Sequence, residues 1–326
     1  MTRRSTFVKK TVSLVLRLAI VAACLLYSFW DLDFADLMTA LRGYDIPALI
    51  ITVVFSFAGY WAMALRFNYL SNFESGNMLC FKAFFLCMAV NNIAPAKLGE
   101  VAKAFYMRRE CGFSLGRSLS MVFWERFYDL NAILALGVAV AFYFNVKMAF
   151  IPLAVGVPSI WAILWVLRMY PAFSDRIIRL MPSSRLSEFL AELKLQLVHS
   201  VSLKMLIALV GYTAVCWALY AGTGLLTLMW VADLPITLFQ AVAVFTLSAL
   251  GMAVPSTPGA FGVFEAAVVF ALSLFGVGKG EALAAGLVLH MIQYIPVTVV
   301  GALILAKSGL NLRKIRERDV DEAPTS

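Results

Sequence analysis

Long runs of apolar residues alternate with short polar segments along most of the chain. The longest runs cover residues 11–30, 46–65, 115–145, 147–167, 205–232 and 281–306. A helix that crosses the hydrocarbon core of a bilayer needs roughly 20 apolar residues, and each run has about that length. The pattern therefore predicts an all-α polytopic membrane protein with about six full transmembrane helices.

Two further apolar segments, 78–94 and 236–254, end in breaks that are rich in Asn, Pro and Gly. The breaks read Asn91-Asn92-Ile93-Ala94-Pro95 and Pro255-Ser256-Thr257-Pro258-Gly259, and each precedes another short helical pattern, at 97–109 and 259–276. Two topologies fit this pattern. Each broken segment can cross the membrane, which gives eight or more spans, or it can form a re-entrant hairpin, over 78–109 and 236–276.

The distribution of charge favours the re-entrant hairpins. With a cytoplasmic N-terminus, six spans and two hairpins, the outer segments contain few basic residues, namely Arg42, Lys147 and Lys279, against Asp31, Asp33, Asp36, Asp45, Asp233 and Glu281. The inner segments collect Arg66, Arg108, Arg109, Arg117, Arg168, Arg176, Arg179, Arg185, Lys194, Lys204, Lys307, Arg313, Lys314, Arg316 and Arg318. Because basic residues mark the cytoplasmic side, both termini are expected there, including a charged tail over 310–326. Basic and apolar residues alternate over 172–200, which predicts an amphipathic segment on the cytoplasmic membrane surface.

In this topology the chain has two membrane halves, 1–145 and 146–309. Each half reads span, span, hairpin, span, and the halves are inverted relative to each other. The breaks also match, since Pro95-x-x-x-Gly99-Glu100 resembles Pro258-x-x-x-Gly262-x-x-Glu265, and 25 residues on from Glu100 and Glu265 stand Glu125 and His290. Paired broken helices in an inverted repeat point to a transporter site.

Composition excludes several other classes of protein. Hydrophobic residues make up 62% of the chain and charged residues only 14%, against about 25% charged residues in soluble domains. The net charge of +8 comes from basic residues between apolar runs, so we expect no nucleic-acid partner. Five cysteines without a C-x-x-C pair and two histidines give no metal centre. Nucleotide, dinucleotide and hydrolase motifs are absent from the sequence, so we expect neither a cofactor nor catalytic residues.

Charged residues inside one apolar run are the first candidates for a functional site. Glu125, Arg126 and Asp129 lie about ten residues into the run that begins at 115. A charged side chain at the middle of a bilayer costs on the order of 2.5–3.5 kcal/mol, so the three must face protein or water. Two interpretations stay open: a structural ion pair of Arg126 with Asp129, or a site for a charged headgroup or coupling ion.

The two breaks supply the remaining candidates. Thr257 is placed to cap a helix and Pro258 to begin it, and helix N-termini inside a membrane attract phosphate or carboxylate. The alternative is that these residues only allow the chain to turn. The candidate substrate-binding residues are Asn91, Asn92, Lys97, Gly99, Glu100, Lys103, Glu125, Arg126, Asp129, Ser256, Thr257, Gly259, Gly262, Glu265, His290, Gln293 and Tyr294.

Three motifs in order resemble a known family. They are Pro95-Ala96-Lys97-Leu98-Gly99-Glu100, Glu125-Arg126-Phe127-Tyr128-Asp129 and Pro258-Gly259-Ala260-Phe261-Gly262-Val263-Phe264-Glu265. Together they look like the flippase-like membrane family that includes the transmembrane region of lysylphosphatidylglycerol synthases. The resemblance covers nearly the whole chain and implies movement of a lipid between leaflets of the bacterial cytoplasmic membrane. The soluble synthase domain has no counterpart in this sequence, so aminoacyl transfer is not expected.

The sequence therefore predicts a lipid flippase or flippase-like transporter for a lipid with an anionic headgroup, of phospholipid or polyprenyl-phosphate type. Lys97, Lys103 and Arg126 would hold the anionic part, and Glu100, Glu125, Asp129 and Glu265 would balance charge or carry protons. The alternatives are a membrane-embedded lipid phosphatase or transferase and a non-transporting partner subunit of a lipid-synthesis complex. Further partners to consider are a second copy of the chain and a lipid-synthesis protein.

Overall fold

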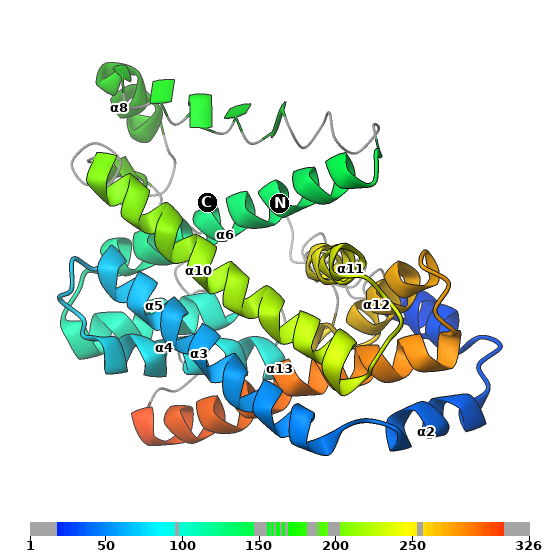
Figure 1. Cartoon of the computed structure of the whole chain (residues 1–326). Helices are drawn as coiled ribbons and strands as arrows, with labels where there is room; N and C mark the ends of the chain where they lie inside the picture. Colours follow the sequence, from blue (N-terminus) through cyan, green and yellow to red (C-terminus); the bar gives the residue numbers. More distant parts are fainter. Residues whose placement is uncertain are drawn as a thin grey trace, which may run out of the picture. The chain divides into compact units, whose positions relative to one another are not determined.

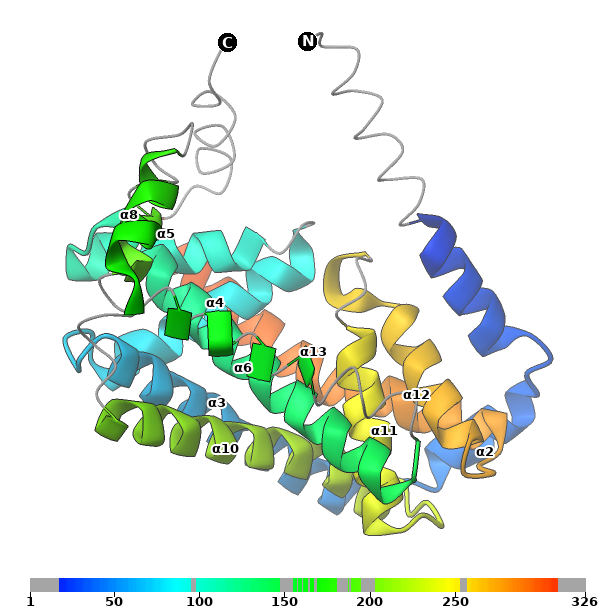
Figure 2. The ribbon, with the colours of Figure 1, turned by 90° about the horizontal axis from the view of Figure 1, so that it is seen from above.

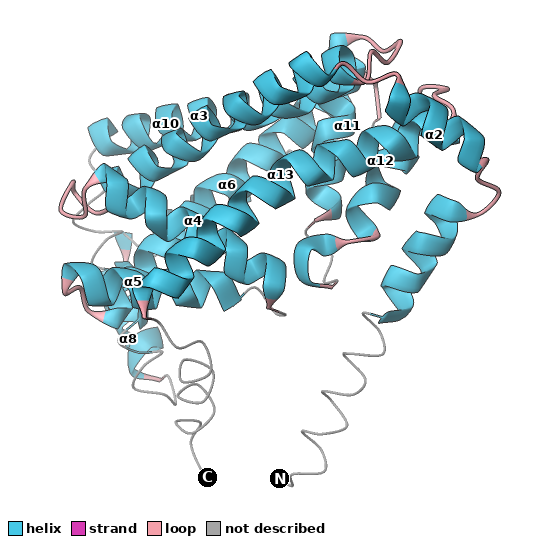
Figure 3. Ribbon diagram, turned by 90° about the horizontal axis from the view of Figure 1, so that it is seen from below, coloured by secondary structure: helices cyan, strands magenta, loops and turns pink. Residues whose placement is uncertain are grey.

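The structure is a computed structural model that describes residues 18–94, 98–146, 203–252 and 257–309, and interrupted parts of 155–194. Regular secondary structure in these residues is entirely helical (Figure 3). Four of the described helices are long and apolar enough to cross a membrane, and five segments qualify if one bent pair counts as a single span. The chain is therefore an all-helical, multi-pass membrane protein.

The four long helices match four predicted spans. They are α3 (Ile46–Leu70), α6 (Leu115–Tyr143), α10 (Leu203–Leu226) and α13 (Lys279–Ser308), and a π-helical turn, η1 (Thr227–Val231), continues α10 (Figure 1). Their apolar stretches are long enough to cross the hydrocarbon core. The predicted span over 147–167 falls mostly outside the described residues.

The first apolar run forms a bent pair of helices. Helix Leu18–Phe29 is followed by α2 (Phe34–Arg42), and the two meet at 81°. Asp33 ends the bend because its side chain accepts a hydrogen bond from the Ala35 N–H at 2.7 Å, which caps α2. The sequence predicts an outer connection between two spans over 31–45. In the structure this connection contains a helix, and Leu37 of that helix is buried.

Two short helices flank each Pro/Gly-rich break. The first break separates α4 (Asn77–Ile93) from α5 (Leu98–Cys111), and the second follows α11 (Leu238–Gly251). The α-helix that follows the second break begins later than the predicted residue 259. A single 3₁₀ turn, η2 (Pro258–Ala260), precedes α12 (Val263–Ser273), because Gly259 and Gly262 have φ values of 70° and 83° that end helical geometry. Helices α11 and α12 lie side by side (Figure 2).

The predicted amphipathic segment over 172–200 is described in part. Helix α8 (Pro171–Arg179) begins it, and Lys194 makes an ion pair with Asp175 of α8 at 2.6 Å. Residues 195–200, and the predicted tail over 310–326, lie outside the described part of the chain.

The chain folds into two compact units that are interleaved along the sequence. Unit 1 takes the described residues of 1–58, 91–96 and 218–296, and unit 2 takes those of 59–90, 97–217 and 297–326. Each unit is described separately below.

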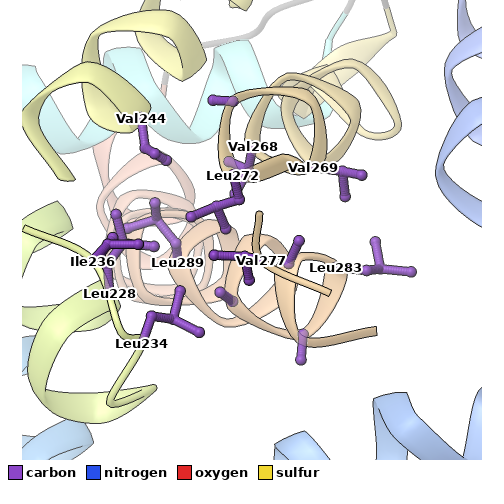
Figure 4. Packing of buried hydrophobic residues seen from close by; sticks show 14 of the residues in the cluster. Leu228, Leu234, Ile236, Val244, Val268, Val269, Leu272, Val277, Leu283 and Leu289 are labelled. Carbon is purple, nitrogen blue, oxygen red and sulfur yellow. The ribbon is translucent and has the colours of Figure 1, made fainter. Parts of the chain in front are cut away.

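Unit 1 has an apolar core built from α2, α3, η1, α11, α12 and α13. Leu228, Val244, Val268, Leu272 and Leu289 are among its buried side chains (Figure 4). Small residues line α13 within this core, at Ala282, Ala284 and Ala285. Close contact between apolar helices through small residues is the usual way to pack helices in a membrane.

In unit 2, α13 and α4 approach each other closely at Gly301, which has the nearest neighbours of all the described glycines. A Cβ added to Gly301 of α13 would lie 2.6 Å from the Ala89 Cβ of α4, and closer still to the Phe85 carbonyl oxygen. Helices α5 and α6 also pack against each other in this unit. Tyr60 of α3 stacks on Phe84 of α4 with ring centroids 5.3 Å apart. These contacts hold α3, α4 and the last part of α13 together.

An exposed ion pair ties the loop before α4 to the start of α6. Arg117 donates to both carboxylate oxygens of Glu74, at 2.9 and 2.8 Å. The hydrogen bonds from Arg117 hold the pKa of the Glu74 carboxyl below its usual range. Glu74 lies between α3 and α4, outside the four long helices, and Arg117 lies in the first turn of α6.

Candidate functional site

Six charged side chains of unit 2 form one cluster. They are three cations and three carboxylates from α3, α5 and α6: Arg66, Lys103, Arg126, Glu100, Glu125 and Asp129. We call this set the charge cluster. With all six groups ionised, its charges cancel. This balance lowers the free-energy cost of burying the six groups in an apolar helical protein, since unpaired buried charges are strongly destabilising.

Arg66 is the member that the sequence interpretation missed. The sequence pattern predicts a cytoplasmic Arg66 just beyond a span. In the structure α3 continues to Leu70, and the Arg66 side chain is fully buried. Its Nη1 donates to Asp129 Oδ1 at 2.7 Å and to Thr213 Oγ1 at 3.2 Å, and its Nη2 lies 3.7 Å from Glu125 Oε1. The signal available in the sequence was the turn Phe67-Asn68-Tyr69-Leu70, which continues the helix past the arginine.

Lys103 and Glu125 form the tightest contact of the charge cluster. The Lys103 Nζ donates to Glu125 Oε2 at 2.6 Å, and both side chains are almost completely buried. The Nζ also lies 3.6 Å from the centroid of the Phe67 ring, a cation–π contact. Lys103 is therefore held between a carboxylate and an aromatic face.

Arg126 is the partly exposed cation of the charge cluster. Its side chain is 41% exposed, although its Nε atom is buried, against 20% for Glu100 and 16% for Asp129. It lies 3.3 Å from Asp129, 3.5 Å from Glu125 and 3.8 Å from Glu100. The ion pair of Arg126 with Asp129, which one of the two open interpretations contains, is present in the structure, and Glu100 also meets Arg126.

A neutral donor, the indole of Trp217, also binds Asp129. Trp217 of α10 donates its indole N–H to Asp129 Oδ1 at 3.1 Å, to the same oxygen that Arg66 binds. Asp129 thus accepts from α3 and α10 on one oxygen, while its other oxygen faces Arg126. The carboxylate is fixed in place on three sides.

Unit 1 contains a second polar site, around Glu265 and His290. Glu265 Oε1 lies 2.6 Å from Nδ1 of His290, and both side chains are buried. Glu265 Oε2 accepts the N–H of Gly262 at 2.7 Å, which caps the N-terminus of α12. The rings of Phe261 and Phe264 lie on His290, with centroids 4.8 and 4.7 Å away. Glu265 and His290, which are 25 residues apart in the sequence, are thus in direct contact.

Tyr294 connects this pair to both breaks. Its hydroxyl donates to the backbone carbonyl of Asn92, at the end of α4, at 3.4 Å. Its ring faces Gly259, where an added Cβ would lie only 2.6 Å from Tyr294 Cε2. The preceding residue, Gln293, accepts a hydrogen bond from the Tyr220 hydroxyl of α10 at 3.0 Å. Asn92, Gly259 and Tyr294 therefore belong to one site in unit 1, and Gln293 joins α13 to α10 in the same unit.

The two glutamates that follow the breaks occupy equivalent positions in their helices. Glu100 is the third residue of α5, and Glu265 is the third residue of α12. An acidic residue in the first turn balances the positive end of the helix dipole. Each helix that follows a break thus carries its own anion, and each of these glutamates meets a side chain of the next long helix, Arg126 and His290.

The remaining candidates lie at the edges of these sites. Gly99 is buried in the first turn of α5, and Asn91 is half-buried at the end of α4. Thr257 occupies the N-cap position of η2 and Pro258 begins the turn, as predicted, but the Thr257 side chain makes no cap hydrogen bond and its hydroxyl donates to the Phe261 carbonyl at 3.3 Å. Lys97 and Ser256 lie outside the described residues.

Comparison with known proteins gives two matches. The family model described as "Lysylphosphatidylglycerol synthase TM region" matches residues 14–301, which include all candidate site residues. A UPF0104 membrane protein of Methanocaldococcus jannaschii is 26% identical over 233 residues, which cover 70% of this chain and 97% of the relative. The similarity thus extends over both polar sites.

Proposed function

This chain belongs to the lysylphosphatidylglycerol synthase transmembrane-region family, and from that premise we propose that it is a lipid flippase or flippase-like transporter. It moves a lipid with an anionic headgroup between the leaflets of the bacterial cytoplasmic membrane. The substrate is a phospholipid or a polyprenyl-phosphate type of lipid.

The exposure of Arg126 carries the proposal. The residue lies about midway along α6, a helix long and apolar enough to cross a membrane, yet its side chain is 41% exposed. A guanidinium at that depth does not face hydrocarbon, because the cost is several kcal/mol. It therefore faces water or a polar ligand, and a polar path reaches the middle of the bilayer.

The other members of the charge cluster then have distinct roles. Arg66 and Lys103 hold Asp129 and Glu125 in place from buried positions. Those carboxylates and Glu100 orient the guanidinium of Arg126, and Arg126 binds the phosphate of the headgroup bidentately, as arginine favours. Lys97 is the second cation that we assign to the headgroup.

The membrane arrangement that we propose follows from the same features. The breaks after α4 and α11 are the tips of two re-entrant hairpins, and six full spans surround them, with both termini in the cytoplasm. The equivalent positions of Glu100 and Glu265 in α5 and α12 support an inverted repeat of the halves 1–145 and 146–309.

Lipid movement in liposomes that contain the purified protein tests the function. Fluorescent anionic, zwitterionic and polyprenyl-phosphate lipids serve as probes, and dithionite reports the leaflet that each occupies. Loss of one hydrogen-bonded charged contact costs about 1.5–3 kcal/mol, so Arg126→Ala is expected to slow the transported probe by about tenfold to a hundredfold.

Arg117→Ala is the matched control, because Arg117 lies at the start of the same helix and pairs with Glu74. It should transport like the wild type. If folded wild-type protein moves no probe, the flippase function is refuted. Phosphate release from a lipid pyrophosphate would then support the enzyme alternative.

A further inference from the structure

The described residues bury two carboxylates, and the protein neutralises them differently. Glu125 has Lys103, Arg126 and Arg66 within ion-pair distance. Glu265 has no lysine or arginine within that distance among the described residues, and its partners are the Gly262 N–H and the ring of His290. Glu125 is thus neutralised by fixed positive charges, whereas the counter-charge of Glu265 depends on a histidine.

A buried carboxylate–imidazole pair is neutral overall when it holds one exchangeable proton, as carboxylate and imidazolium. Without that proton the pair is negative, as carboxylate and neutral imidazole. The Gly262 N–H and the positive end of α12 stabilise this negative state. Both states are therefore accessible to the same site, and this is the requirement for a site that takes up and releases protons.

The groups around the pair do not fix its charge. Tyr294 of α13 and Phe261 before α12 contact the His290 ring, and Phe264 lies on its other side. Helix Leu18–Phe29 contributes Leu25 beside Gly262. Among the described residues, Tyr294 is the one further titratable group in contact with the pair, and its hydroxyl is engaged with the Asn92 carbonyl.

We propose that the Glu265–His290 pair binds the coupling proton of the transport cycle, so that the lipid moves together with a proton. This rests on the proposed function. The proton adds to Nε2 of His290, while the Nδ1–H donates to Glu265 in both states. Release breaks the same N–H bond and returns the proton to water, and no other bond changes.

Coupling follows from charge. A protonated pair is one unit more positive than the deprotonated pair, so it favours the states of the transport cycle in which an anionic headgroup is bound. By linkage, the headgroup favours protonation to the same degree. An anionic lipid and a proton therefore bind together and leave together.

The first test is direct, because the chain has only two histidines. His199→Gln protein labelled with ¹⁵N-histidine and placed in nanodiscs gives NMR signals from His290 alone. We expect the Nε2 signal to change from imidazole to imidazolium as the pH is lowered over the range in which the protein stays folded, while Nδ1 keeps its proton. An Nε2 signal that is constant over this range would overturn the proposal.

The second test measures coupling in liposomes. An imposed pH gradient should drive the transported anionic probe into one leaflet, and probe lipid should accelerate proton entry, which a trapped pH dye reports. Glu265→Gln keeps an acceptor for the Gly262 N–H and should lose both effects. Glu281→Gln is the control. It removes an exposed carboxylate of α13, the helix that carries His290, and should retain both effects.

The outcomes separate the two proposals. If wild-type protein moves lipid at the same rate with and without the gradient and without proton entry, coupling is overturned and the flippase function stands. If the wild type moves no lipid, the function fails, and the NMR titration alone decides whether the pair exchanges a proton. The wild-type measurements suffice for this decision if Glu265→Gln does not fold.

Discussion

Removal of either partner of the Lys103–Glu125 contact is expected to destabilise the protein by unequal amounts. Lys103→Met leaves Glu125 beside the guanidiniums of Arg126 and Arg66, at 3.5 and 3.7 Å. Glu125→Met leaves Lys103 buried with no carboxylate within ion-pair distance among the described residues. The glutamate retains neighbours of opposite charge, and the lysine does not.

The distances give the size of this asymmetry. At an effective dielectric constant of about 20, Coulomb's law gives a gross attraction of about 6 kcal/mol at 2.6 Å and about 4–5 kcal/mol at 3.5–3.7 Å. A buried charge left without its partner costs about 3–5 kcal/mol, so Glu125→Met should fall in that range. Lys103→Met should cost about 2 kcal/mol less, because two attractions remain.

The double variant Lys103→Met/Glu125→Met removes both charges and strands neither. We expect it to be less destabilised than the sum of the single variants by about 2 kcal/mol or more. The free energy of unfolding can be measured by SDS titration in mixed micelles, with far-UV circular dichroism to report helix content. Lys82→Met, at an exposed lysine of α4, is the control and should change it by about 0.5 kcal/mol or less.

Two results would refute this reasoning. One is a Lys103→Met variant at least as destabilised as Glu125→Met, which would mean that the two guanidiniums do not compensate Glu125. The other is a double variant whose loss equals the sum of the single losses, which would mean that the two residues do not interact.

Three further predictions concern backbone contacts and the exposed ion pair. Gly301→Ala should lower the free energy of unfolding by about 1–3 kcal/mol through overpacking against α4, whereas Gly211→Ala, with open space around it, should leave it unchanged or raised. Gly259→Ala should destabilise more than Gly276→Ala, since both have positive φ but only the first meets a tyrosine ring; equal losses in SDS titration would contradict this. The depressed pKa of Glu74 stabilises the fold above the pKa of the unfolded carboxyl, about 4.3, and that stabilisation is lost as pH falls through the folded value. Wild type and Glu74→Gln should therefore converge in acid, and a stability difference that persists there would argue against it.

Much of the helical architecture is predictable from the sequence, because a membrane span depends on a local property. The four long helices appear where roughly 20 apolar residues follow one another. The breaks were predictable for the same reason, since Pro and Gly act on their own turn of the chain. The repeated spacing of 25 residues selected Glu265 and His290 as candidate polar positions, but it did not predict that they touch.

Partner choice was not predictable, because it depends on how helices pack. Arg66 looked like a cytoplasmic charge at the end of an apolar run, and only the contact of α3 with α6 shows that it binds Asp129. Lys103 lies three residues after Glu100 in the sequence, yet its Nζ binds Glu125 of the next helix. The sequence gives the positions of the charged residues, and the packing of the helices determines which of them are buried and which of them pair.

Under the proposed function, the glutamates in the first turns of α5 and α12 have a consequence for turnover. Because each helix end already has an internal counter-ion, an incoming headgroup competes with a resident carboxylate and gains only the difference in binding free energy. Weak binding of this kind suits a substrate that is itself a bulk component of the membrane, since a carrier must release what it binds on every cycle. These two carboxylates would thus keep the residence time of the lipid short and the cycle rapid.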